Sequence, residues 1–115
     1  MNTQIIEAMA ALREAVRTSE EYAAYLRCRE TVEKDPELLA KVEEYRQREF
    51  RYQNILSPEE RETERGQLLA LMGQLRQNPA ADAYFRTERH LCRILQQAAK
   101  EVLAPLELHT EGMID

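Results

Sequence analysis

Apolar residues recur at helical intervals near both ends of the chain. In the N-terminal part the intervals alternate between four and three residues, through Ile5, Met9, Leu12, Val16, Ser19, Ala23 and Leu26. The same alternation runs through Tyr84, Glu88, Leu91, Leu95, Ala98 and Val102. A period of 3.5 residues is the signature of a coiled coil, so the pattern predicts two long helices that pack nearly parallel or antiparallel.

Prolines mark the starts of the other helices. Three dipeptides each place a capping residue before a proline at the first helical position: Asp35-Pro36, Ser57-Pro58 and Asn78-Pro79. Ser57 is also followed three residues later by Glu60, which completes a capping-box pattern. With Pro105 closing the last helix, these signals predict four helices, over about residues 3–34, 36–54, 58–76 and 79–104.

The third predicted helix carries a narrow face of small residues, Gly66, Ala70 and Gly73. Each interior glycine costs about 1 kcal/mol relative to alanine. We interpret the face as part of a weak helix that lies at the surface. Close approach of a second backbone to these glycines is the alternative.

Composition agrees with one all-α domain over residues 1–105. The chain has 115 residues, of which 43% are hydrophobic and 32% are charged, and only three are glycine. This mixture disfavours disorder and turn-rich β folds. We expect an antiparallel four-helix arrangement whose first and last helices are long. Because one such layer buries a thin core, we also expect a dimeric helical bundle. Residues 106–115 are predicted to form an acidic, flexible tail.

The distribution of charge gives little support for direct nucleic-acid binding. The formal net charge is −5, and the tail residues Glu107, Glu111 and Asp115 supply −3 of it. The remaining chain shows no basic block, whereas binding to a nucleic-acid backbone needs clustered Lys and Arg. No apolar run approaches the roughly 18 residues of a membrane span. No secretory signal is recognised, so we expect a cytoplasmic protein without a membrane anchor.

The sequence contains no recognised catalytic motif. It lacks a Gly-rich phosphate loop, a nucleophile elbow, a metalloprotease motif and a dinucleotide fingerprint. We therefore expect neither enzymatic activity nor a cofactor. Cys28 and Cys92 are candidate metal ligands, but two thiolates fall short of the four ligands that an iron–sulfur cluster usually needs. We interpret both as small buried hydrophobes, with a metal or cluster shared across an oligomer as the alternative.

Glu88 interrupts the C-terminal apolar series and is a candidate polar contact. An unpaired carboxylate within such a series is costly, so it needs a partner or solvent. Arg27, Arg29 or a tyrosine hydroxyl are the candidate partners. The simplest interpretation is a polar contact that fixes the register of packed helices.

A basic stretch in the second predicted helix is the other polar candidate. Arg46, Arg48 and Arg51 lie there with aromatic neighbours, so they could face an acidic partner or RNA. Interleaved glutamates favour the simpler interpretation of a solvated face with weak ion pairs.

Three motifs follow one another along nearly the whole chain. They are SEEYAAY at 19–25, DPELL at 35–39, and Asn78-Pro79 followed by AYFRTE at 83–88. In these motifs the chain resembles the YlbF/YmcA family of small helical bacterial regulators. The resemblance implies a cytosolic, self-associating, non-enzymatic protein. The best-known members join a third protein in a complex that modulates the endoribonuclease RNase Y, and this complex affects competence, sporulation and biofilm formation. Iron–sulfur chemistry is also associated with that complex.

We therefore expect a regulatory adaptor that acts by protein–protein interaction, by resemblance as a modulator of RNase Y-dependent RNA processing. A self-assembling structural module and a metal-carrying subunit are the alternatives. The predicted interface, for a second copy or another partner, consists of Ile5, Met9, Leu12, Val16, Tyr22, Tyr25, Tyr84, Phe85, Glu88, Leu91 and Leu95.

Overall fold

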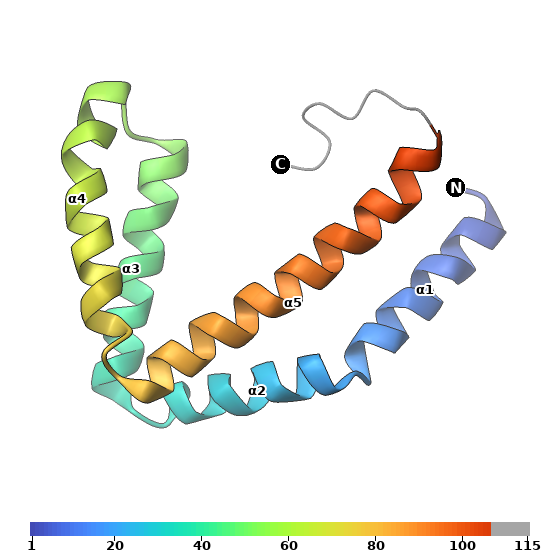
Figure 1. Cartoon of the computed structure of the whole chain (residues 1–115), viewed down its shortest axis with the longest axis horizontal. Coiled ribbons are helices and arrows are strands. Elements are labelled where there is room, and N and C mark those ends of the chain that lie inside the picture. The colour runs from blue at the N-terminus through green and yellow to red at the C-terminus, as the bar shows by residue number, and fades with distance from the viewer. Residues whose placement is uncertain (107–115) are drawn as a thin grey trace. The chain divides into compact units, whose positions relative to one another are not determined.

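The computed structural model describes residues 1–106, which form helices and contain no β-strand (Figure 1). The elements are α1 (Thr3–Arg17), α2 (Glu20–Glu33), α3 (Pro36–Asn54), α4 (Pro58–Leu75), α5 (Pro79–Leu103) and a 3₁₀-helix, η1 (Ala104–Leu106). The all-helical prediction is confirmed. No helix in this part of the chain is long and apolar enough to cross a membrane.

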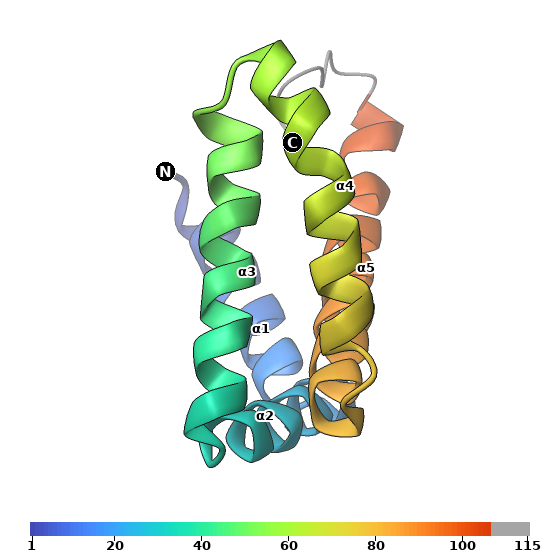
Figure 2. The ribbon, with the colours of Figure 1, turned by 90° about the vertical axis from the view of Figure 1, so that its left-hand side faces the viewer.

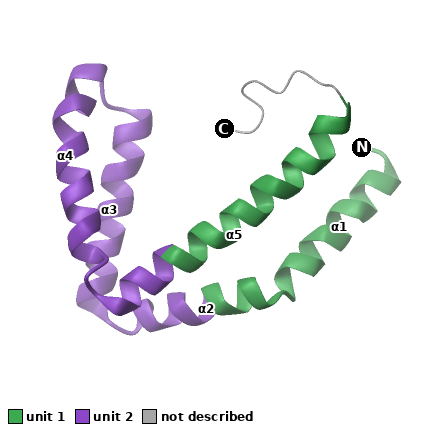
Figure 3. Ribbon diagram, in the orientation of Figure 1, with its two compact units in different colours: residues 1–25, 86–115 green, residues 26–85 purple. Residues whose placement is uncertain are grey.

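The chain divides into two compact units (Figure 3). Unit 1 consists of residues 1–25 and 86–115, and unit 2 consists of residues 26–85. Helices α2 and α5 each contribute residues to both units. A single domain over 1–105, an antiparallel bundle and a dimer stay predictions. The predicted tail lies outside the described residues, apart from Leu106.

The three predicted starts at prolines are confirmed. The Asp35 carboxylate accepts a hydrogen bond from a first-turn amide of α3 at 3.2 Å. Ser57 and Glu60 form the full capping box at the start of α4. The side-chain oxygen of Asn78 accepts from the first-turn amides of α5 at 2.9 and 3.4 Å. Local capping chemistry therefore decides where these helices begin.

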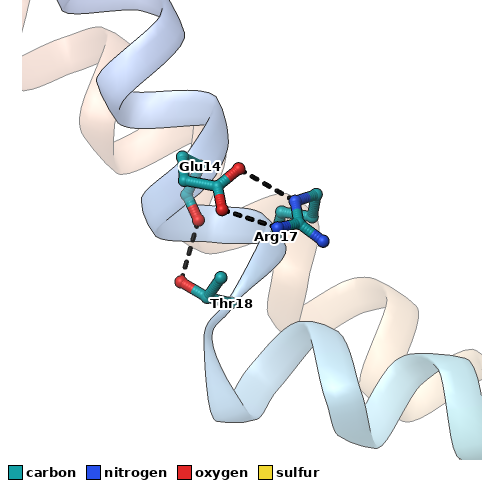
Figure 4. Close-up of polar contacts among 3 residues, drawn as sticks. All are labelled: Glu14, Arg17 and Thr18. Carbon is teal, nitrogen blue, oxygen red and sulfur yellow. Dashed lines mark hydrogen bonds and ion pairs between the residues drawn. The ribbon is translucent and has the colours of Figure 1, made fainter.

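The prediction of one helix over 3–34 is wrong, because the helix is interrupted at Thr18 and Ser19. The Ser19 hydroxyl accepts from the Tyr22 backbone amide at 3.1 Å and donates to the Val16 carbonyl at 2.6 Å. The Thr18 hydroxyl donates to the Glu14 carbonyl at 2.9 Å (Figure 4). Such side-chain bonds offer the backbone an alternative to the helical ladder. Two glutamates after Ser19 then favour a new helix start.

The buried core lies in unit 2. There α3 and α4 pack side by side as an antiparallel hairpin (Figure 2). The buried residues of the chain's described part are Val32, Leu38, Val42, Tyr45, Leu68, Leu75, Ala81, Tyr84 and Phe85. The rings of Tyr45 and Phe85 meet edge to face, with centroids 5.9 Å apart. Arg46 covers this aromatic group, since its guanidinium carbon lies 5.3 Å from the Tyr84 ring centroid and 5.6 Å from that of Phe85.

Gly66 and Gly73 lie inside α4 and face open space. A Cβ atom built at either position meets no other atom within 4 Å. This favours the interpretation of an exposed face over close approach by another segment of the same chain. We therefore expect Gly66→Ala and Gly73→Ala each to raise the free energy of unfolding by about 0.5–1 kcal/mol.

Urea denaturation measures this gain, and Ala70→Gly on the same face is the matched control. It should lower the free energy of unfolding by a similar amount. A loss of stability with either alanine would contradict the exposed-face interpretation.

The capping box of α4 lowers the pKa of Glu60. Its carboxylate accepts from the Ser57 backbone amide at 3.1 Å, and the Ser57 hydroxyl also stabilises the ionised form. Because the folded-state pKa is depressed, this contribution to stability is present above the ordinary glutamate pKa. It is lost as the pH falls through the lowered value.

An NMR titration should therefore place the Glu60 pKa below its ordinary value in the native protein. Ser57→Ala removes the hydroxyl that helps to lower the Glu60 pKa, so it should move this pKa upward. An ordinary Glu60 pKa in the native protein would show that the capping box is not formed in solution.

Candidate interaction surface

An apolar groove runs along unit 1. Its volume is about 580 Å³, and the residues that line it come from α1, α2 and α5. They are Met9, Leu12, Arg13, Val16, Arg17, Tyr22 and Leu95. We call it the α1–α5 groove. Met9, Leu12 and Val16 supply the apolar lining from α1, and Arg13 and Arg17 are the only charged residues that line the groove.

Apolar side chains of unit 1 remain in contact with solvent. Leu12 is 48% exposed and Leu95 is 43% exposed. The other large apolar residues that are exposed on α1 and α5 are Ile5, Ile6, Met9, Ile94 and Val102. No described residue of unit 1 is buried. An extended apolar surface of this kind is typical of an interaction site.

The last turn of α1 holds a charged group at the edge of the groove. Arg17 Nε and Nη2 donate to the Glu14 carboxylate at 2.9 and 2.6 Å (Figure 4). This hydrogen bonding lowers the pKa of Glu14 and raises that of Arg17, so both are charged at neutral pH. Both side chains are exposed, so the pair orients Arg17 more than it stabilises the fold.

The structure brings part of the predicted interface together. Met9, Leu12, Val16, Tyr22 and Leu95 line the α1–α5 groove. The remaining predicted positions of unit 1 are the exposed Ile5 and the half-buried Tyr25, Glu88 and Leu91. Tyr25 stacks on Tyr22, with ring centroids 6.2 Å apart.

Tyr84 and Phe85 are placed elsewhere, in the core of unit 2. Their rings pack against α3 residues and are covered by Arg46. The interaction surface proposed below therefore does not include them. The partners considered for Glu88 stay predictions.

Two arginines of the predicted basic stretch are engaged within unit 2. Arg46 stacks on the aromatic core. Arg48 forms an ion pair with Glu64, to which its Nε donates at 3.0 Å, and its Nη2 donates to Gln67 at 2.8 Å. Arg51 is exposed. Because Arg46 and Arg48 make these contacts within unit 2, the basic stretch is a poor candidate for a surface that binds a partner.

The cysteines are free thiols in different units. Cys28 is half-buried on α2 in unit 2, and Cys92 is exposed on α5 in unit 1. Residues 1–106 contain no group of three or more His, Cys, Asp or Glu side chains that could hold a metal ion. The interpretation of both cysteines as buried residues does not fit Cys92.

Sequence reasoning missed Arg13 and Arg17 as lining residues. They follow Met9 at successive intervals of four residues, so helical spacing places Met9, Arg13 and Arg17 along one edge of the helix. The sequence pattern that could have identified them as lining residues is this pair of cations four residues apart.

Comparison with known proteins identifies the family. The chain matches the family model described as control of competence regulator ComK, YlbF/YmcA, over residues 5–107. Neither a curated protein nor a solved structure matches the chain. The matched region contains all five α-helices except the first two residues of α1. The chain therefore belongs to the YlbF/YmcA family of regulators of competence.

Proposed function

We propose that the chain is a non-catalytic regulatory adaptor of the cytoplasm, which binds other proteins through the α1–α5 groove. One observation carries the proposal: the apolar side chains of α1 and of the α5 segment in unit 1 are left in water. Removing such surface from water contributes about 25 cal/mol per Å². The family description, control of a competence regulator, supports a regulatory role.

The first partner that we propose is a second copy of the chain. A homodimer has a self-complementary interface, in which the same apolar face serves both subunits. The 3.5-residue series of α1 suits packing against another helix. Ile5, Met9, Leu12 and Leu95 would lie at the centre of this interface, with Val16, Tyr22, Tyr25, Glu88 and Leu91 around it.

The second partner that we propose is the RNase Y-associated complex, by resemblance to the best-known members of the family. Binding to that complex would modulate RNA processing and, through it, competence, sporulation or biofilm formation. The proposal assigns no chemical step and no cofactor to the chain.

Complementation in the native host tests the proposal. The gene is deleted, and RNase Y-dependent transcript cleavage is measured after it is restored as the native form or as Leu12→Glu/Leu95→Glu. The double variant places carboxylates on the groove, where a protein partner could not pair them. We expect the native gene to restore cleavage and the double variant to fail.

Leu69→Glu provides the matched control for this experiment. Leu69 is 69% exposed on α4 in unit 2, so the same substitution lies away from the groove. It should restore cleavage fully. Unchanged cleavage in the deletion strain, or equal rescue by both variants, would refute the proposed function.

A further inference from the structure

A row of basic side chains runs along α5 within unit 1. Arg86, Arg89, Arg93 and Lys100 follow one another at intervals of three, four and seven residues, and all are exposed. At 3.6 residues per turn these intervals place them within an arc of about 60° on one side of the helix. With a rise of 1.5 Å per residue, the row extends about 21 Å. We call it the α5 basic stripe.

Three of the four cations in this stripe are unpaired within the described part of the chain. Arg89, Arg93 and Lys100 make no ion pair or hydrogen bond with the described part of the chain. Glu101 lies at the edge of the stripe, and its carboxylate accepts from Gln97 at 2.8 Å. Glu88 lies outside the stripe, about 100° from Arg89 and 160° from Arg86 in angular position, by helical geometry.

The stripe also lies away from the α1–α5 groove. Leu95 lines the groove, and two residues along a helix separate it from Arg93 by about 160°. A partner seated on the apolar groove would therefore leave the stripe in contact with solvent.

The composition of the stripe distinguishes between possible ligands. The core of a protein interface is apolar and depleted in charge, whereas this stripe has no apolar residue along its line. A membrane-bound helix inserts an apolar face beside its basic one, but here the apolar side of α5 faces the groove. A polyanion needs only aligned cations, because its affinity comes from the release of counterions.

We infer that the α5 basic stripe binds the phosphate backbone of single-stranded RNA. Three of its four cations are arginines, whose planar guanidinium matches a phosphate with two hydrogen bonds. A flexible single strand can follow a straight row of cations. The stripe was not expected from the sequence, because its members are spread over 15 positions and come together only on the helix.

Fluorescence anisotropy of the purified full chain with a labelled oligouridylate of about 12 nucleotides tests the inference, at about 50 mM potassium chloride. The logarithm of the binding constant should fall with the logarithm of salt concentration with a slope of about −2 to −3, for three to four phosphates. Arg89→Gln/Arg93→Gln/Lys100→Gln should weaken binding at least about tenfold and flatten the slope to about −1 or less.

Two variants control for net charge and for fold. Arg27→Gln/Lys34→Gln/Arg61→Gln removes three cations from unit 2 and should bind within about twofold of the native chain. Arg89→Lys/Arg93→Lys keeps the charge and should retain most of the salt slope.

Equal losses in both triple variants, or no binding by the native chain, would overturn the inference. Displacement of RNA by polyglutamate at equal charge would assign the stripe to an acidic protein instead. Because no partner protein is used, the result is independent of the proposed adaptor function.

Discussion

Phe85→Ala should lower the free energy of unfolding by about 3–5 kcal/mol. Phe85 is only 7% exposed, and its ring contacts Tyr45 and Tyr84 with centroids 5.9 and 5.7 Å away. Its removal leaves a cavity in the one buried core that the described residues form, and it takes away a ring beneath the guanidinium of Arg46. A loss of this size is a large part of the roughly 5–15 kcal/mol that stabilises a typical domain.

Urea denaturation followed by circular dichroism measures this loss, at one fixed protein concentration because association adds to apparent stability. Phe50→Ala is the matched control, since Phe50 is 59% exposed in the same unit. It should change the free energy of unfolding by no more than about 0.5 kcal/mol. Similar effects of the two substitutions would show that Phe85 is not a core residue.

Leu12→Glu/Leu95→Glu should raise the dissociation constant of the dimer at least about 100-fold, equivalent to about 2.7 kcal/mol. Both leucines line the α1–α5 groove and are nearly half exposed in the single chain. The carboxylates stay solvated in the monomer, so the fold is retained. In the dimer they would be buried against apolar side chains without a partner, and that desolvation opposes association.

Sedimentation equilibrium measures the dissociation constant, and circular dichroism verifies that the helices are kept. Leu69→Glu makes the same chemical change on α4, outside the groove, and should alter the constant by no more than about twofold. If the double variant associates as tightly as the native chain, the dimer uses another surface.

Features set by neighbouring residues could be predicted from the sequence. The starts of α3, α4 and α5 follow from a capping side chain and a proline, which act within one turn. The apolar series of α1 also depends only on spacing, so it correctly placed Met9 and Leu12 on one face. The break at Ser19 was missed because the series appeared to run through it, although its hydroxyl bonds the backbone instead.

Features set by tertiary packing could not be predicted in this way. Tyr84 belongs to the same series as Leu95, but the first turns of α5 lie in unit 2 and are covered by Arg46 of α3. Nothing in the spacing of α5 shows which neighbour covers which turn. The sequence likewise suggested that Arg48 faces a partner. Its ion pair with Glu64 could not be predicted, because the two residues are far apart in sequence.

Sedimentation equilibrium of the native chain, over concentrations from about 1 to 500 μM, tests the central claim most directly. If a second copy covers the apolar face of unit 1, the measured mass will rise from 13.5 kDa to twice that value within this concentration range. A mass of 13.5 kDa at every concentration would contradict it, because that face would then be stable in water without a second copy.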